Sequence, residues 1–183
     1  MNDLALFRRK LLRNPRQVSA LTPSSRFLAA AMAEGLGPAT GRVVEFGPGT
    51  GQLTRAILAT GVAPQDLALF ELDADFVAHL APIFPGVTVH HLGADRAAEV
   101  TPPGIGAVVS GLPLLSMPTP IREAIVSAAF ALLAPGAPMI QFTYGRKPPL
   151  PPESIDKLGL RVEVGRKVWA NLPPARVYRF YRV

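Results

Sequence analysis

Short apolar segments alternate with helical segments along most of this sequence, and that alternation restricts the fold more than any other feature. The expected strands span residues 42–46, 67–72, 87–92, 107–110 and 139–144. The expected helices span residues 26–34, 52–59, 74–83 and 121–133. Because parallel strands must be joined by long crossover connections, usually helices, the pattern predicts a parallel sheet with helices on its faces.

The pattern changes after residue 144. A short helix is expected at 152–158, and segments 162–170 and 176–183 are rich in β-branched and aromatic residues. Asn171-Leu172-Pro173-Pro174, a turn signal, separates these two segments. We therefore expect an α/β, Rossmann-like fold with a seven-stranded, mostly parallel sheet whose last strand is antiparallel, preceded by an N-terminal amphipathic helix. The 183 residues leave room for a single domain, 1–183.

A glycine turn follows the first expected strand. Residues 43–51 read Val-Val-Glu-Phe-Gly-Pro-Gly-Thr-Gly and lead directly into a helical segment. Glycine at Gly47, Gly49 and Gly51 lets the backbone approach a ligand closely. The turn is therefore the first candidate for a binding site.

The spacing of these glycines separates the turn from two common nucleotide motifs. The NAD fingerprint needs its third glycine where Gln52 stands, and no Gly-Lys-Ser/Thr follows as in a P-loop. Glu71 ends the second expected strand, where a carboxylate can accept hydrogen bonds from both hydroxyls of a ribose. The pattern predicts a ligand that contains adenosine but no pyrophosphate.

Composition excludes several other classes of protein. There is no cysteine, and His79, His90 and His91 lack the spacing of a zinc site, so we expect no metal. No stretch approaches the ~18 apolar residues of a membrane span. Basic residues stand where a signal peptide would need its apolar stretch, so we expect no export.

The net charge of +6 is unevenly distributed. Residues 1–26 hold six basic side chains against one acidic, residues 27–145 hold four against nine, and residues 146–183 hold nine against three. Basic terminal segments fit a chain whose ends face a polyanion, either an anionic lipid surface or a nucleic acid. The alternative is that these charges only keep the chain soluble.

Residues 1–26 contain a basic amphipathic helix that we assign to membrane binding. Its apolar residues follow helical spacing, so they can enter the bilayer interface while the basic residues meet anionic head groups. The residues assigned to this contact are Leu4, Phe7, Arg8, Arg9, Lys10, Leu11 and Arg13. The helix could instead dock on the core of the domain.

The glycine turn and the acids near it resemble the motif set of class I S-adenosylmethionine-dependent methyltransferases. The residues that carry the resemblance are Glu45, Gly47, Gly49, Gly51, Glu71 and Asp95. It implies S-adenosyl-L-methionine as cofactor and S-adenosyl-L-homocysteine as product. It also implies that the glycines line the methionine part, Glu71 holds the ribose and Asp95 contacts the adenine. The alternative is a tight turn in some other α/β fold.

More of the chain resembles one branch of that family, the bacterial phospholipid N-methyltransferases. The matching segments are residues 22–25, 45–51, 108–115, 141–145, 171–175 and 177–178. The resemblance implies methylation of phosphatidylethanolamine and its mono- and dimethylated products, toward phosphatidylcholine. The enzyme would be cytoplasmic and bound peripherally to the inner face of the cell membrane, with anionic lipid rather than nucleic acid as its partner.

Two alternatives remain open. The ribosomal RNA adenine dimethyltransferases share the glycine motif, but they carry Asn-Leu-Pro and an aromatic residue after the fourth strand, where this chain has Ser110-Gly111-Leu112-Pro113-Leu114. A module that binds the cofactor or a membrane without catalysis is the other alternative.

Methyl transfer from a sulfonium mainly requires alignment of donor and acceptor, but an ethanolamine nitrogen must first lose a proton. Tyr144, at the carboxyl end of the fifth expected strand, is our candidate to orient the amine, and Ser110 at the neighbouring strand end is the second. Their alternatives are a tyrosine packed on the core and a plain turn. Expected contacts to the lipid phosphate are Ser24, Ser25, Arg146 and Lys147, although helix capping alone would also explain the two serines.

Overall fold

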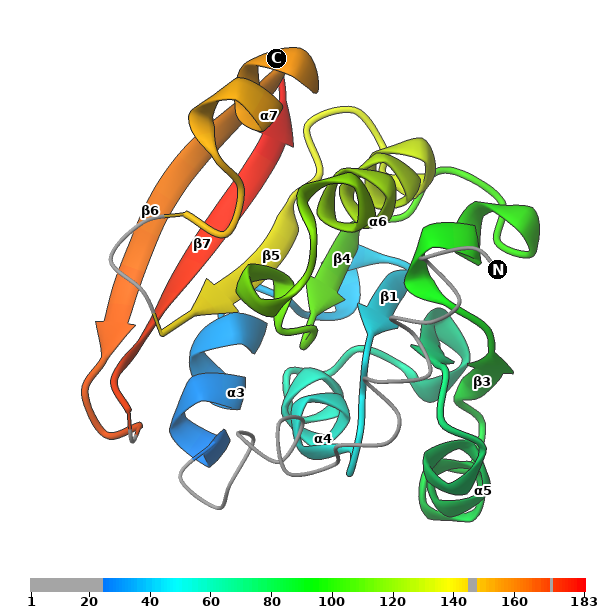
Figure 1. The fold of residues 1–183 in the computed structure, drawn as a ribbon. Coiled ribbons are helices and arrows are strands. Elements are labelled where there is room, and N and C mark those ends of the chain that lie inside the picture. The colour runs from blue at the N-terminus through cyan, green and yellow to red at the C-terminus, as the bar shows by residue number, and fades with distance from the viewer. Residues whose placement is uncertain (1–24, 145–147, 172) are drawn as a thin grey trace.

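The computed structural model describes residues 25–144, 148–171 and 173–183, and Figure 1 shows a single sheet flanked by helices. The strands are β1 Val43–Phe46, β2 Leu67–Glu71, β3 Thr88–His91, β4 Ala107–Ser110, β5 Met139–Thr143, β6 Leu160–Val168 and β7 Ala175–Arg182. The helices are α3 Ser25–Ala33, α4 Gln52–Ala59, α5 Ala74–Ile83, α6 Thr119–Leu132 and α7 Pro152–Lys157. Short 3-10 turns include η3 Ala94–Glu99 and η4 Leu114–Ser116.

The strand order is β3-β2-β1-β4-β5-β7-β6, in one seven-stranded sheet. β1 to β5 pair in parallel, whereas β7 is antiparallel to both β5 and β6. The expected fold class is therefore confirmed, and every expected element from α3 onward has bounds within two residues of its expectation. The N-terminal amphipathic helix lies outside the described residues.

The register brings the carboxyl ends of the parallel strands to one edge of the sheet. Phe46 of β1 pairs with Phe70 of β2 on one side and with Ser110 of β4 on the other. The chain therefore leaves β1 at the point where the strand order reverses, which is where open α/β sheets bind ligands.

The central parallel strands β1, β4 and β5 are buried on both faces. One face packs against α3, α4 and α5 through Leu28, Ile57 and Leu80. The other packs against η3 and α6 through Ala97 and Val126. Helices therefore fix the strands from both sides. The loops at the strand ends are left to contact a ligand.

No helix in the described ranges is long and apolar enough to cross a membrane.

Candidate functional site

The glycine turn after β1 has the backbone conformation that its sequence predicts. The φ angles of Gly47, Gly49 and Gly51 are 69°, 53° and 80°, in the region that residues with a side chain rarely adopt. The N–H of Gly47 donates to the carbonyl of Phe70 on the neighbouring strand at 3.0 Å. A Cβ on Gly49 would meet no atom within 4 Å, so the middle of the turn faces open space.

Glu71 reaches back from the end of β2 to this turn. One carboxylate oxygen accepts a hydrogen bond from the N–H of Gly49 at 3.1 Å. The other accepts from the N–H groups of Leu72 and Asp73 at 2.8 and 3.0 Å. The predicted ribose acid and the predicted glycine turn are thus in direct contact, although they are distant in the sequence.

Glu45 is fully buried beneath the turn. Its Oε2 accepts a hydrogen bond from Oγ1 of Thr54, on α4, at 2.7 Å, and its Oε1 has no partner among the described residues. Burial raises the pKa of Glu45 to about 8, the hydrogen bond from Thr54 opposes this rise, and the charge of Glu71 adds to it. The carboxyl is therefore mostly protonated at neutral pH.

Asp95 lies at the same edge, in η3 after β3, and is half-buried. Pairing of Glu71 with His91 brings the end of β3 beside the end of β2. Nε2 of His91 lies 3.0 Å from the carbonyl oxygen of Leu72, which holds the loop after Glu71. Glu71 and Asp95 therefore follow adjacent strands, as their expected roles require.

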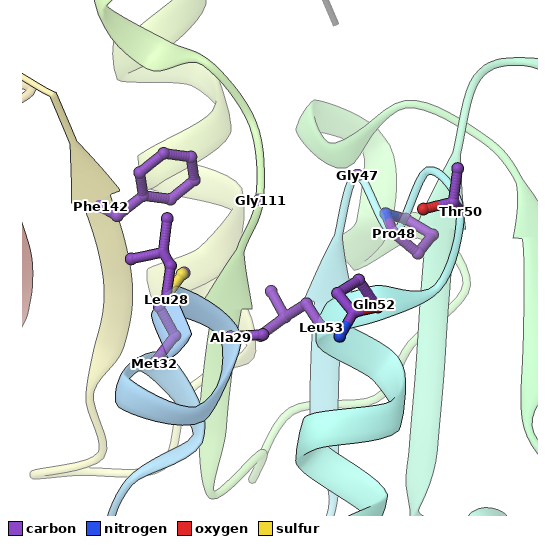
Figure 2. Close-up of a pocket in the computed structure, with 10 residues that line it drawn as sticks. All are labelled: Leu28, Ala29, Met32, Gly47, Pro48, Thr50, Gln52, Leu53, Gly111 and Phe142. Atoms are coloured by element: carbon purple, nitrogen blue, oxygen red, sulfur yellow. The ribbon is translucent and has the colours of Figure 1, made fainter. Parts of the chain in front are cut away.

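A hollow opens on the other side of the glycine turn, toward β4 and β5. Figure 2 shows Leu28 of α3 next to Phe142 of β5, with the glycine turn and the first turn of α4 across from them. The lining residues are Leu28, Ala29, Met32, Gly47, Pro48, Thr50, Gln52, Leu53, Gly111 and Phe142. Its walls are mainly apolar, so it suits a ligand group that leaves water.

Close approach of two loops shapes the floor of this hollow. The N–H of Gly111 donates to the carbonyl of Phe46 at 2.8 Å. A Cβ on Gly111 would lie 2.8 Å from the carbonyl oxygen of Gly47, so only glycine fits there.

The two candidate catalytic residues are differently placed. Ser110 is fully buried, and its Oγ accepts a hydrogen bond from the N–H of Leu112 at 3.4 Å. Tyr144 is half-buried and packs edge-to-face on Phe142, with 5.4 Å between ring centroids. Tyr144 therefore lies beside the hollow through Phe142, whereas Ser110 is not among the lining residues.

Tyr144 also contacts Asn171 in the turn of the last hairpin. Burial raises the pKa of Tyr144, and a side-chain hydrogen bond with Asn171 opposes this rise. The phenol is consequently neutral at physiological pH and can orient an amine rather than accept its proton as a phenolate. Asn171 is buried, and its Nδ2 donates to the carbonyl of Pro173 at 2.7 Å.

Sequence analysis missed two polar side chains near this edge. Asn171 lies in the expected turn but also anchors Tyr144. Gln141 is fully buried and donates through Nε2 to the carbonyls of Leu112 and Phe142, both at 2.9 Å. Its Oε1 has no partner among the described residues. A polar residue inside an otherwise apolar strand was the available signal for Gln141.

The remaining candidates cannot be placed in the site. Ser25 is the first residue of α3, and nothing is described of its side chain. The candidates outside the described residues are Ser24, Arg146 and Lys147, together with the membrane residues Leu4, Phe7, Arg8, Arg9, Lys10, Leu11 and Arg13. Within residues 25–144, 148–171 and 173–183, no group of three or more acidic or histidine side chains could hold a metal ion.

No protein-family model matches this chain, and no curated protein matches it. Solved structures do. The magnesium protoporphyrin IX methyltransferase of Synechocystis PCC 6803, with bound S-adenosylmethionine, superposes with a TM-score of 0.70 at 10% identity, over 100% of this chain and 98% of that one. The 1,6-didemethyltoxoflavin N1-methyltransferase of Burkholderia thailandensis, with S-adenosylhomocysteine, gives 0.70 at 14% identity, over 97% and 88%.

A third structure, the glycopeptide N-methyltransferase MtfA complexed with S-adenosylmethionine, gives a TM-score of 0.65 at 16% identity, over 86% of this chain and 94% of that one. The three enzymes act on unrelated acceptors, so what they share with this chain is the scaffold and not the substrate. The chain has the fold of the S-adenosylmethionine-dependent methyltransferases.

Proposed function

We propose that this protein is an S-adenosylmethionine-dependent methyltransferase that methylates the amine of phosphatidylethanolamine at a membrane surface. The observation that carries the cofactor assignment is the contact between the Glu71 carboxylate and the N–H of Gly49. It joins a ribose-binding acid to a glycine turn on a fold whose solved relatives hold S-adenosylmethionine or S-adenosylhomocysteine. The bound cofactor would supply an electrophilic methyl group.

The residues present fit this cofactor. The Glu71 carboxylate has about four lone-pair positions and three backbone donors, so it can also accept a hydrogen bond from a ribose hydroxyl. Oε1 of Glu45 is a buried polar atom without a partner among the described residues, and a hydrogen-bonding group of the ligand would satisfy it. The open space at Gly49 leaves room for the ligand against the backbone.

The phospholipid substrate is supported by the residues around the hollow and by the chain's charge. The hollow is apolar, which excludes water from the reacting amine, and Tyr144 presents a neutral phenol beside it. The basic N-terminal segment gives a route to anionic lipid. Two of the solved relatives are N-methyltransferases, so the scaffold accommodates a nitrogen acceptor.

The test is label transfer from S-adenosylmethionine carrying a radioactive methyl group to vesicles of phosphatidylethanolamine and phosphatidylglycerol. We expect label in monomethyl-phosphatidylethanolamine on thin-layer chromatography. Glu71→Gln should lower kcat/KM for the cofactor about 10- to 100-fold, because one charge-assisted hydrogen bond contributes about 1.5–3 kcal/mol.

Asp75→Asn is the matched control, because Asp75 is exposed on α5 and its substitution removes the same charge from the same edge. It should retain full activity. Absence of label in any lipid would overturn the substrate, and label in ribosomal RNA instead would support the adenine methyltransferase alternative.

A further inference from the structure

The last hairpin presents an exposed tryptophan at the edge of the sheet that holds the site. Trp169 follows the end of β6 and is 72% exposed. Because β7 runs antiparallel to β5, the turn that precedes it lies beside the end of β5, where Thr143 pairs with Arg176. Figure 1 shows this turn and the start of α3 on the side toward which the arrowheads of β4 and β6 point.

Phe27 forms the second exposed aromatic group on this side, at 46% exposure in the first turn of α3. Its neighbour Leu28 and the residue before Trp169, Val168, belong to the same buried cluster. α3 packs against β5, β6 and β7. The two segments therefore meet at the same end of the sheet. Because side chains alternate along a strand, Val168 faces α3 and Lys167 faces the other side of the sheet, so the two exposed aromatic residues flank this end.

A basic side chain accompanies each ring. Nζ of Lys167 lies 3.5 Å from the centroid of the Trp169 ring, and Cζ of Arg26 lies 4.7 Å from that of Phe27. Among the described residues neither cation forms a salt bridge. Arg176 pairs with Lys167 across the hairpin, which adds a third positive charge.

The opposite half of the same edge is acidic. The end of β2 and the segments that follow β2 and β3 carry Glu71, Asp73, Asp75 and Asp95. The edge is therefore polarised, with the acids toward β2 and β3 and the aromatic and basic residues toward β6 and β7. An anionic surface would attract one half and repel the other, so it would select one orientation of the molecule.

We propose that Arg26, Phe27, Lys167 and Trp169 form a membrane-contact surface, here called the edge surface, for a bilayer that contains anionic phospholipid. Trp and Phe rings prefer the boundary between head groups and acyl chains, where Lys and Arg can reach phosphate. This inference rests on the proposed function, because it brings a lipid to the hollow. Leu28, next to Phe27, is one of the residues that line the hollow.

Trp169 is the only tryptophan in the sequence, so its fluorescence reports on the edge surface alone. The full-length protein is mixed with phosphatidylglycerol–phosphatidylethanolamine vesicles, some with bromine on their acyl chains. We expect the emission to shift to shorter wavelength and brominated lipid to quench it. Protein that sediments with vesicles while its emission stays unchanged would overturn the proposal, as would absence of any binding.

Substitutions separate this surface from general charge attraction. Lys167→Gln should weaken vesicle binding about fivefold. Arg182→Gln removes the same charge at the far end of the same hairpin and should leave binding unchanged. Equal losses in both variants would show that binding depends on the total positive charge and not on the position of Lys167, and would overturn the proposal. Binding of RNA but not of vesicles would also overturn it.

The failure of this surface and the failure of the proposed function give different results. Trp169→Ala should lose most methylation of lipid in vesicles but retain methylation of the same lipid dispersed in detergent micelles. A fluorescence shift without methylation of any lipid would leave the surface standing and overturn the substrate. Methylation of vesicle lipid that is unaffected by Trp169→Ala would support the substrate and overturn the edge surface.

Discussion

At the scale of single residues, Glu45 shows what the sequence can and cannot predict. Its place before the glycine turn identified it as a site residue, and the structure places it under that turn. Its protonation follows from burial by β1, α4 and the neighbouring strands, and the local pattern of residues does not contain that information. Gln141 and Asn171 were missed for the same reason, because their importance comes from contacts with distant segments.

The raised pKa of Glu45 predicts that stability falls as the pH rises. Its pKa is about 8 in the folded protein against an ordinary value of 4.5, so between these values the unfolded chain releases a proton that the folded chain keeps. The contribution of Glu45 to the free energy of unfolding should decrease by about 1.4 kcal/mol per pH unit across this window and level off above it. Glu45→Gln should remove that slope.

Urea unfolding at several pH values between 5 and 8 would measure the effect. Glu153→Gln, which changes an exposed carboxylate in α7, is the control and should keep the slope of the parent protein. Identical slopes in the parent and in Glu45→Gln would show that Glu45 is ionised in the folded state.

At the scale of elements, the glycine turn depends on two separate requirements at Gly51. This residue caps α4 with a φ of 80°, and a Cβ there would lie 2.5 Å from the ring of Phe84. Gly51→Ala should therefore lower the free energy of unfolding by about 3 kcal/mol, because backbone strain and overpacking add. Gly136→Ala is a matched control with a φ of 77° and no atom within 4 Å of its Cβ. It should lose only about 1 kcal/mol.

Thermal or urea unfolding of both variants would separate the cost of backbone strain from the cost of overpacking against Phe84. Equal losses would mean that Phe84 moves aside without cost and that only the backbone conformation matters.

The elements themselves were largely predictable, because apolar periodicity and turn residues are local properties. The expected strands and helices occur at nearly the expected bounds. The hollow was not predicted, since it forms where α3 meets the ends of β4 and β5 (Figure 2). Leu28, Ala29 and Met32 share one helical face, but nothing in the sequence says which strands that face covers.

At the scale of the whole molecule, positive charge is concentrated in the two terminal segments of the sequence. The first 26 residues carry six basic side chains against one acidic, and the final 38 residues carry nine against three. Within the described residues, Lys167 and Arg176 of the last hairpin lie toward the edge that also holds the hollow, whereas Arg182 lies at the far end of the hairpin. A bilayer that attracts Lys167 and Arg176 would meet the edge of the sheet where the hollow opens rather than the opposite edge.

We predict that the basic N-terminal segment contributes to vesicle binding but not to cofactor binding. Replacing Arg8, Arg9, Lys10 and Arg13 by glutamine should weaken binding to anionic vesicles at least ~100-fold at low salt, because each basic residue contributes about 1 kcal/mol near the surface. The same variant should bind S-adenosylhomocysteine as tightly as the parent in calorimetry. Parent binding to vesicles should also fall steeply as salt is raised, since screening shortens the reach of these charges. Loss of cofactor affinity together with vesicle binding would show instead that residues 1–26 belong to the core of the domain.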